Sequence, residues 1–108
     1  MTDAATDPFD ALGDPMRRRI LRLLADRPRP VGALADELPI SRPAVSRHLR
    51  LLKEAGLVTE EAHGTRRIYR LHEQGLGEVR SYLEGVWGEA LGRFRLLAEN
   101  TDPRRSGR

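Results

Sequence analysis

Apolar residues recur at spacings of three and four through the first half of the chain, the pattern of helices that bury one face. We expect a short helix after Asp7-Pro8, a helix from Pro15 to about Asp26, a third from Val31 to Leu38 and a fourth capped by Ser41. An aspartate followed by a proline is a typical helix start. The carboxylate caps the first turn, and proline lacks only an N–H that would be unpaired there. The sequence therefore predicts a mainly helical domain.

The fourth predicted helix has an apolar side and a cationic side. Val45, Leu49 and Leu52 recur at i, i+4 and i+7, and Gly56 is placed to end the helix in a left-handed conformation. Together with the preceding helix and a three-residue turn, this is typical of a helix-turn-helix, whose second helix enters the DNA major groove. The alternative is an ordinary surface helix with a solvated charged face. The residues outside the apolar stripe are Arg42, Ser46, Arg47, Arg50 and Lys53.

Two β-rich stretches follow this helix and predict a hairpin. Residues 57–62 and 67–71 contain β-branched and aromatic side chains, and Gly64 in the connection can adopt a positive φ angle. A hairpin with a cationic tip directly after a recognition helix is typical of the wing of a winged helix-turn-helix. Its arginines would reach phosphates or a narrow minor groove, where negative potential attracts them. We expect DNA contacts from the wing at His63, Thr65, Arg66 and Arg67.

The longest predicted helix runs from Leu76 to Glu99 and carries an apolar face too broad for so small a domain. Part of this face is expected in the core of the same chain, and the rest against a second copy in a twofold dimer. The glycines at 85, 88 and 92 argue against an unbroken helix. The expected dimer interface comprises Phe9, Leu12, Val79, Tyr82, Leu83, Val86, Trp87, Leu91 and Phe94.

Positive charge is concentrated in the helix-turn-helix and the hairpin. The 108 residues include 19 lysines and arginines and 16 aspartates and glutamates, for a net charge of +3. Residues 41–70 contain seven of these cations and three glutamates, so this segment is net +4 and the remainder is −1. Such a concentration is typical of a nucleic-acid interface. We interpret the arginines at 17, 18, 19 and 22 as a solvated helix surface, with a phosphate contact as the alternative.

The sequence argues against several other classes of protein. Without cysteine, the chain has no disulfide, thiolate metal site or cysteine nucleophile. The polar N-terminus is unlike a signal peptide, and no apolar run approaches the ~20 residues that span a bilayer, so we expect a cytoplasmic protein. No nucleophile–base pair is visible, and Gly75-Leu-Gly77 lacks the rest of a nucleotide-binding fingerprint. We therefore expect that the protein is not an enzyme and that it binds no cofactor.

The order and spacing of these motifs resemble the winged helix-turn-helix transcriptional repressors of the ArsR type. The similarity covers roughly residues 9–98, with matches in 12–21, 34–35, 45–49, 52–58 and 64–71. It implies a mostly α-helical fold with a small β-hairpin, a homodimer formed by the terminal helices, and recognition helices in successive major grooves of a near-palindromic operator. For His48, a satisfied histidine at the edge of the core is an equal alternative. The implied groove-facing set is Ser41, Arg42, Ser46, Arg47, His48 and Arg50.

The chain departs from the members of this family that sense metals. Many of those members use cysteines near the helix that corresponds to residues 31–38, or histidine and aspartate pairs on the last helix. This chain has no cysteine and no histidine on its last helix, and carboxylates alone are weak ligands for transition metals. We therefore expect the metal-independent branch, with no metal site.

The expected function is repression by promoter occlusion, with double-stranded operator DNA as the partner. Any inducer would be an unknown small molecule or a partner protein. The alternatives are a winged-helix protein-interaction module and a nonspecific DNA-binding protein. We expect one domain over residues 8–99, between a flexible N-terminal tail over 1–7 and a disordered C-terminal tail over 100–108.

Overall fold

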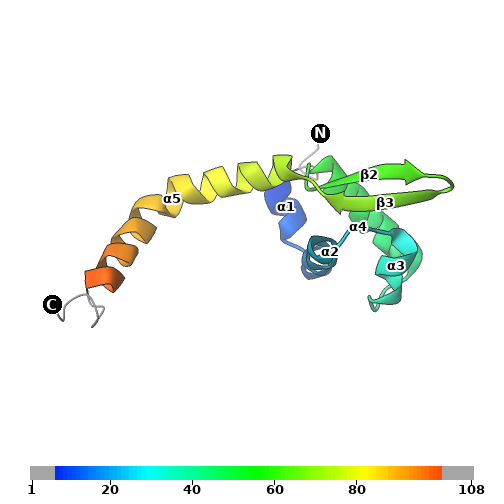
Figure 1. Cartoon of the computed structure of the whole chain (residues 1–108), viewed down its shortest axis with the longest axis horizontal. Coiled ribbons are helices and arrows are strands. Elements are labelled where there is room, and N and C mark those ends of the chain that lie inside the picture. Colours follow the sequence, from blue (N-terminus) through cyan, green and yellow to red (C-terminus); the bar gives the residue numbers. More distant parts are fainter. Residues whose placement is uncertain (1–6, 101–108) are drawn as a thin grey trace. The chain divides into compact units, whose positions relative to one another are not determined.

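The computed structural model describes residues 7–100, and in its last helix it leaves out the side chains of 91, 94–96 and 98–100. Apart from Asp7 and Asn100, the two predicted tails lie outside the described residues. The described residues form five helices and three strands (Figure 1). In chain order they are α1 (Pro8–Leu12), α2 (Pro15–Asp26), β1 (Arg29–Pro30), α3 (Val31–Asp36), α4 (Arg42–Glu54), β2 (Val58–His63), β3 (Arg66–Leu71) and α5 (Glu73–Asn100).

Side-chain caps begin three helices where the sequence predicts them. The carboxylates of Asp7 and Asp14 accept hydrogen bonds of 2.8–3.1 Å from amides in the first turns of α1 and α2. Ser41 Oγ accepts from the amide of Ala44 at 3.2 Å at the start of α4. After α4, Gly56 has a φ angle of +80°, which confirms the predicted left-handed residue. The caps therefore fix where the recognition helix starts and ends.

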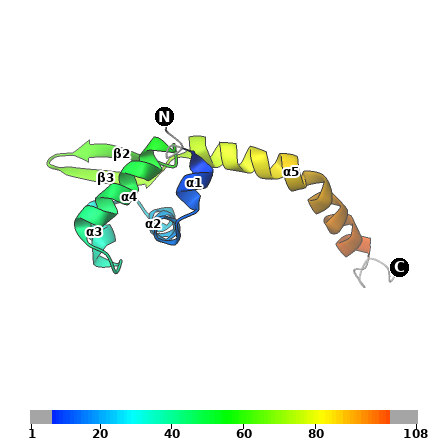
Figure 2. The ribbon, with the colours of Figure 1, turned by 180° about the vertical axis from the view of Figure 1, so that it is seen from behind.

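The helices α2, α3 and α4 enclose the core together with the start of β2. α3 packs against α4, and α4 packs against β2, as the two opposite views show (Figures 1 and 2). The turn between α3 and α4 spans residues 37–41, so the predicted three-residue turn was too short, because α3 ends at Asp36 rather than Leu38. The most deeply buried side chains are Ile20, Leu34, Val45, Leu49, Leu52 and Val58.

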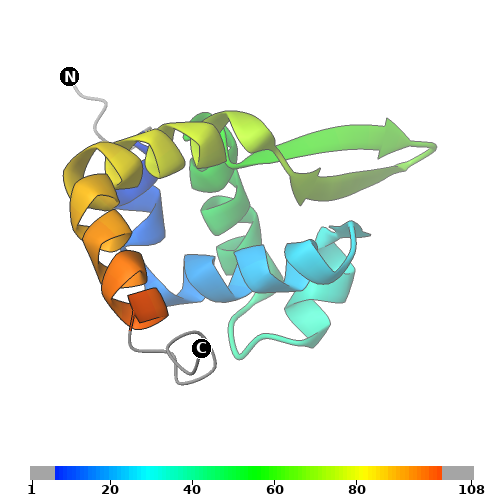
Figure 3. The same ribbon diagram turned by 60° about the vertical axis from the view of Figure 1, so that its left-hand side comes forward.

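The three strands form one antiparallel sheet in the order β1-β3-β2. β2 and β3 pair along their whole length and end with His63 opposite Arg66, so that Gly64 and Thr65 form the turn. Gly64 has a φ angle of +66°, and the hairpin confirms the predicted wing, which projects beyond the helices (Figure 3). The strand β1 was not predicted, because its two residues are too few to show a period of two. Pro30 is acceptable there because β1 lies at an edge of the sheet.

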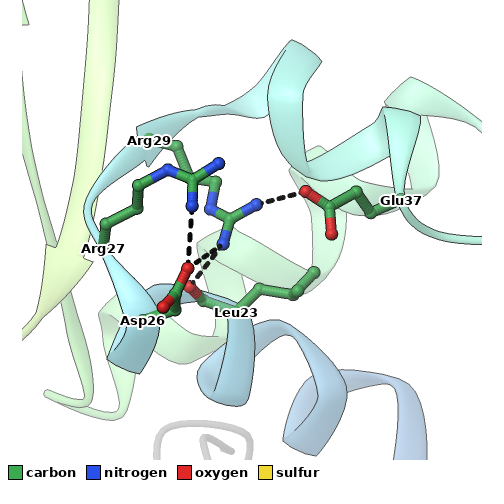
Figure 4. Close-up of polar contacts among 5 residues, drawn as sticks. All are labelled: Leu23, Asp26, Arg27, Arg29 and Glu37. Carbon is green, nitrogen blue, oxygen red and sulfur yellow. Dashed lines mark hydrogen bonds and ion pairs between the residues drawn. The ribbon is translucent and has the colours of Figure 1, made fainter.

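The buried Arg29 on β1 connects the end of α2 to the turn after α3 (Figure 4). Its side chain is 4% exposed. Nη1 donates to the Glu37 carboxylate at 2.5 Å, and Nη2 donates to the Leu23 carbonyl at 3.0 Å and to the Asp26 carboxylate at 3.3 Å. Nε has no partner among the described residues. These directional contacts hold the first helix of the helix-turn-helix in place against α2.

The helix α5 is continuous from Glu73 to Asn100, so its three central glycines do not interrupt it. The chain divides into one compact unit that ends at Glu78 and another that begins at Val79. In the first unit, the amide of Gly75 donates to the carbonyl of Gly56 at 2.9 Å. This contact fixes the start of α5 on the turn that follows the recognition helix.

The residues predicted to form a dimer interface differ in exposure. On α5, Tyr82, Val86 and Trp87 are 53%, 52% and 48% exposed, and Leu83 is also exposed, whereas Val79 is buried. Phe9 on α1 is exposed, and Leu12 packs against the core. The side chains of Leu91 and Phe94 lie outside the described residues. No helix in the described part of the chain is long and apolar enough to cross a membrane.

Candidate nucleic-acid interface

The helix α4 turns its apolar side inward and leaves a row of cations outside. Val45, Leu49 and Leu52 are buried, which leaves the side chains between them at the surface. Arg47 and Arg50 are exposed and form no hydrogen bond or ion pair with any residue that the structure describes. Unpaired guanidinium groups on a helix surface are free to meet phosphates or guanine edges. The other exposed members of the predicted set on this helix are Ser41, Arg42 and Ser46.

His48 differs from this set because it is half-buried and bound to α2. Arg17 donates from Nε to the Ala11 carbonyl at 2.8 Å and lies with Nη1 3.3 Å from His48 Nδ1. Because a guanidinium only donates, Nδ1 accepts, and the neutral ring carries its proton on Nε2. Burial lowers the pKa of His48, and the charges of Arg17 and Arg47 lower it further, while Asp14 opposes them. His48 thus lies at the edge of the core, and a DNA contact from it stays a prediction.

Two arginines of α2 support α1. Arg17 is half-buried, and Arg18 donates from Nη1 to the carbonyl of Leu12 at 2.7 Å. The last carbonyls of a helix have no partners within the helix, so these guanidinium groups satisfy the end of α1. The interpretation of the α2 arginines as a solvated surface is therefore wrong for Arg17. Arg19 and Arg22 are exposed as expected.

The carboxylate of Glu60 compensates part of the positive charge of the wing. The Glu60 carboxylate accepts from Lys53 Nζ at 2.8 Å and from Arg67 Nη1 at 2.9 Å. Hydrogen bonds from Lys53 and Tyr69 hold the pKa of Glu60 below its ordinary value, so the carboxylate is charged at neutral pH. Burial and the hydrogen bond to Glu60 raise the pKa of Tyr69. At the tip, Arg66 is exposed and forms no ion pair with the residues that the structure describes.

A second carboxylate, Glu61, has two basic neighbours. Arg70 Nη2 donates to Glu61 Oε1 at 3.2 Å, and His63 Nε2 lies 3.4 Å from the same oxygen. Thr65 is exposed in the turn. The wing therefore carries fewer free cations than its sequence suggests, because β2 and β3 bring glutamates next to arginines. The strand register that creates these pairs could not be read from composition.

Arg42 leads from the recognition helix into a groove that also borders the wing. The groove is lined by β1, α3, the start of α4 and the start of β3, including Gly32, Asp36, Arg66 and Tyr69. A Cβ atom built on Gly32 would lie 3.0 Å from Nη2 of Arg42, so the guanidinium rests directly on α3. Neither Gly32 nor Tyr69 was predicted from the sequence to belong to the site. A glycine in a short helix is the only sign of Gly32 in the sequence. Its role becomes visible only when the packing of α3 against α4 is known.

A helix-turn-helix with a cationic second helix and a β-hairpin wing defines a winged-helix DNA-binding protein. A family model described as a helix-turn-helix domain matches residues 12–61. The chain is 46% identical over 92 residues to the HTH-type transcriptional regulator Rv2034 of Mycobacterium tuberculosis, over 85% of this chain and 86% of that relative. It is 40% identical over 77 residues to the HTH-type transcriptional repressor SmtB of the same species, over 71% of this chain and 57% of that relative.

A solved structure supports the same assignment. The chain matches an ArsR-like transcriptional regulator from Rhodococcus sp. RHA1 with a TM-score of 0.69 and 30% identity, over 92% of this chain and 94% of that one. The chain belongs to the ArsR family of winged helix-turn-helix transcriptional regulators, which confirms the predicted resemblance. It is a DNA-binding transcriptional regulator and not an enzyme.

Proposed function

We propose that this protein is a homodimeric, sequence-specific repressor that blocks a promoter by occupying an operator within it. The observation that carries the proposal is the exposed row of arginines on α4, whose charge no described carboxylate compensates. Arginine contacts to phosphates supply most of the affinity of such proteins, and side chains in the major groove supply the selection of sequence. The SmtB relative is named a repressor, which supports this direction of regulation.

The dimer follows from the apolar side chains that α5 leaves exposed. Tyr82, Leu83, Val86 and Trp87 fall within two turns of one helix, and a monomer would leave them in water. A twofold dimer through this face presents two copies of α4, which fit half-sites about one helical turn of DNA apart. The near-palindromic operator that we propose mirrors this symmetry.

We further propose that metal ions do not control this repressor. The sequence contains no cysteine, and the described residues include no group of three or more potential metal ligands among histidine and the carboxylates. Carboxylates without nitrogen or sulfur ligands hold transition metals weakly. Any inducer is then a small molecule or a partner protein.

Fluorescence anisotropy with labelled DNA tests the proposal. The DNA upstream of the protein's own gene is titrated with the protein, next to a scrambled duplex of the same length and composition, at two salt concentrations. We expect saturable binding with two protomers per upstream duplex, and a weaker and more salt-sensitive interaction with the scrambled duplex.

Two results would favour the alternatives. Equal, salt-sensitive affinity for both duplexes would indicate a nonspecific DNA-binding protein. Indifference to both duplexes, by a chain that circular dichroism shows to be folded, would indicate a winged-helix protein-interaction module.

A third arm repeats the titration with Zn²⁺ and with a chelator, and a change in affinity between the two would contradict metal independence.

A further inference from the structure

The groove beside the start of α4 joins the two surfaces that are predicted to contact DNA. Its lining includes Arg42 and Ser46 of the recognition helix and Thr65, Arg66 and Arg67 of the wing. The rest of the lining comes from β1, α3 and Tyr69 of β3. Because one groove connects the helix to the hairpin, a ligand within it would touch both DNA-contacting elements at once.

The charge of this groove is unbalanced. Three arginines line it, and the Glu60 carboxylate compensates only Arg67, at 2.9 Å. Arg42 and Arg66 form no ion pair with any described residue, including Asp36, which lies in the same lining. Two free guanidinium groups next to the hydroxyls of a serine and a threonine form a set of donors that suits an anion with several oxygens.

Gly32 allows Arg42 to take its place in the groove. A Cβ atom at position 32 would meet Nη2 of Arg42 at 3.0 Å and Cζ at 3.4 Å. Since glycine costs a helix stability relative to alanine, its position inside the six-residue α3 calls for a reason. The reason that the structure offers is space for the guanidinium of Arg42.

We propose that this groove binds one phosphate of the DNA backbone, held jointly by Arg42 and Arg66, with Gly32 as a positioning residue for Arg42. When α4 lies in a major groove and the wing reaches the adjacent minor groove, the backbone between the two grooves passes this point. Arginine binds phosphate oxygens with paired, planar donors. The clamp fixes the register of the protein on the duplex without reading a base. This inference rests on the proposed function.

The variants Arg42→Gln, Arg66→Gln and the double variant test whether the two residues share one phosphate. Binding is measured by anisotropy on the operator and on a scrambled duplex, across a series of salt concentrations. Each single variant lowers the affinity for both duplexes by roughly the same factor, on the order of tenfold. In the proposed dimer, which carries one clamp in each protomer, the double variant lowers the slope of log affinity against log salt by about 1.8, the value for two phosphates. Its loss of affinity is smaller than the product of the single losses.

Other outcomes would overturn the clamp. A slope change of about 3.6 for the dimer, with multiplicative losses, would mean that the two arginines contact separate phosphates. A loss restricted to the operator would mean that they read bases. The matched control is Arg80→Gln, which removes the same charge from an exposed position of α5. An equal loss in this control would reduce the effect to net charge.

Gly32→Ala separates this positioning role from a general structural role. The added methyl group favours α3, but it requires the guanidinium of Arg42 to shift by a few tenths of an ångström. We expect the melting temperature to stay constant or to rise, while the affinity for both duplexes falls by a smaller factor than in Arg42→Gln. In an Arg42→Gln background the same substitution has no further effect on DNA binding. A Gly32→Ala variant with full affinity for DNA, or one whose affinity and melting temperature fall together, would contradict the role of Gly32.

A final arm distinguishes the DNA backbone from free phosphate as the ligand. The protein without DNA is titrated with inorganic phosphate at constant ionic strength, while NMR follows the amides of Gly32 and Thr65. We expect at most weak, millimolar binding. Submicromolar binding of inorganic phosphate, with the affinity of Arg42→Gln for DNA unchanged, would assign the groove to a free anion. If the wild-type protein binds no duplex, the proposed function fails; if it binds and the groove variants do not differ, only the clamp fails.

Discussion

At the scale of single residues, the arginines that are free to bind DNA differ from those that stabilise the fold in their distance to the nearest carboxylate. Arg67 and Arg70 lie 2.9 and 3.2 Å from glutamates across the hairpin. Arg29 is buried among Glu37, Asp26 and a backbone carbonyl. Arg47 has no such partner in the described part of the chain. A free guanidinium can bind DNA without first giving up an ion pair within the protein.

The substitution Arg47→Ala tests this distinction. We expect the affinity for the operator to fall by about 1–3 kcal/mol if Arg47 reads a base, and the preference at one base position to disappear. Arg70→Ala, which removes the same charge from a position paired with Glu61, should have a smaller effect. Anisotropy against a set of single-base operator variants measures both quantities. An equal loss on every sequence would limit Arg47 to a phosphate contact.

We expect the histidine of the recognition helix to make the stability of the fold depend on pH. The pKa of His48 lies below its ordinary value of 6.5, chiefly because the ring is partly buried and because Arg17 is near. The unfolded chain therefore binds more protons than the folded chain as the pH falls below about 6.5. The contribution of His48 to the free energy of unfolding should be fully present above that pH and should decrease as the pH falls below it.

Thermal melts of wild type and His48→Gln between pH 7.5 and 5.5 measure this contribution. Asp14 and Glu60 do not contribute in that range, because their pKa values are lowered from ordinary values of 3.8 and 4.5. We expect the melting temperature of wild type to fall toward pH 5.5 and that of His48→Gln to fall less. Parallel profiles for wild type and His48→Gln would refute the assignment.

At the scale of elements, two glycines of α5 that are two residues apart have opposite surroundings. A Cβ atom on Gly75 would lie 2.8 Å from the carbonyl of Ala55 and 2.8 Å from a methyl group of Leu57, and nothing lies within 4 Å of one on Gly77. Gly75→Ala should therefore destabilise the fold by about 1–3 kcal/mol. Gly77→Ala should stabilise it by about 0.5–1 kcal/mol, because alanine is the better helix former.

Urea denaturation of the two glycine variants measures the difference. The start of α5 packs on the turn that ends the recognition helix, so a shift there also moves α4. We expect Gly75→Ala to lose affinity for DNA in addition to stability, while Gly77→Ala keeps wild-type affinity. Equal midpoints for the two variants would show that α5 does not begin against this turn.

The elements that the sequence predicts well are those whose signals are local. The Asp-Pro starts, the Ser41 cap and the positive φ angles of Gly56 and Gly64 depend on a few neighbouring residues, and all are confirmed. β1 was missed because its pairing with β3 comes from tertiary packing. The compensation of Arg67 by Glu60 was missed for a similar reason, since it depends on strand register and on the position of α4.

At the scale of the whole molecule, the proposed mode of operator binding needs two recognition helices, and α5 carries the face that we propose for the second copy. The side chains of Tyr82, Val86 and Trp87 are each about half exposed. Burying such aromatic and aliphatic surface against a twofold mate would supply much of the free energy of association. A charge introduced into this face would have to be buried in the dimer without a partner, which would weaken association.

The substitution Trp87→Glu should therefore produce a folded monomer with low affinity for the operator, because each protomer would bind one half-site without its mate. Ser81→Glu introduces the same charge at an exposed position on the opposite face of α5 and should leave the dimer intact. Sedimentation velocity reports the oligomeric state, and anisotropy reports the affinity. If Trp87→Glu sediments as a dimer, α5 is not the interface. If it sediments as a monomer but binds the operator as tightly as wild type, dimerisation exists but does not serve recognition, and the proposed two-helix mechanism is wrong.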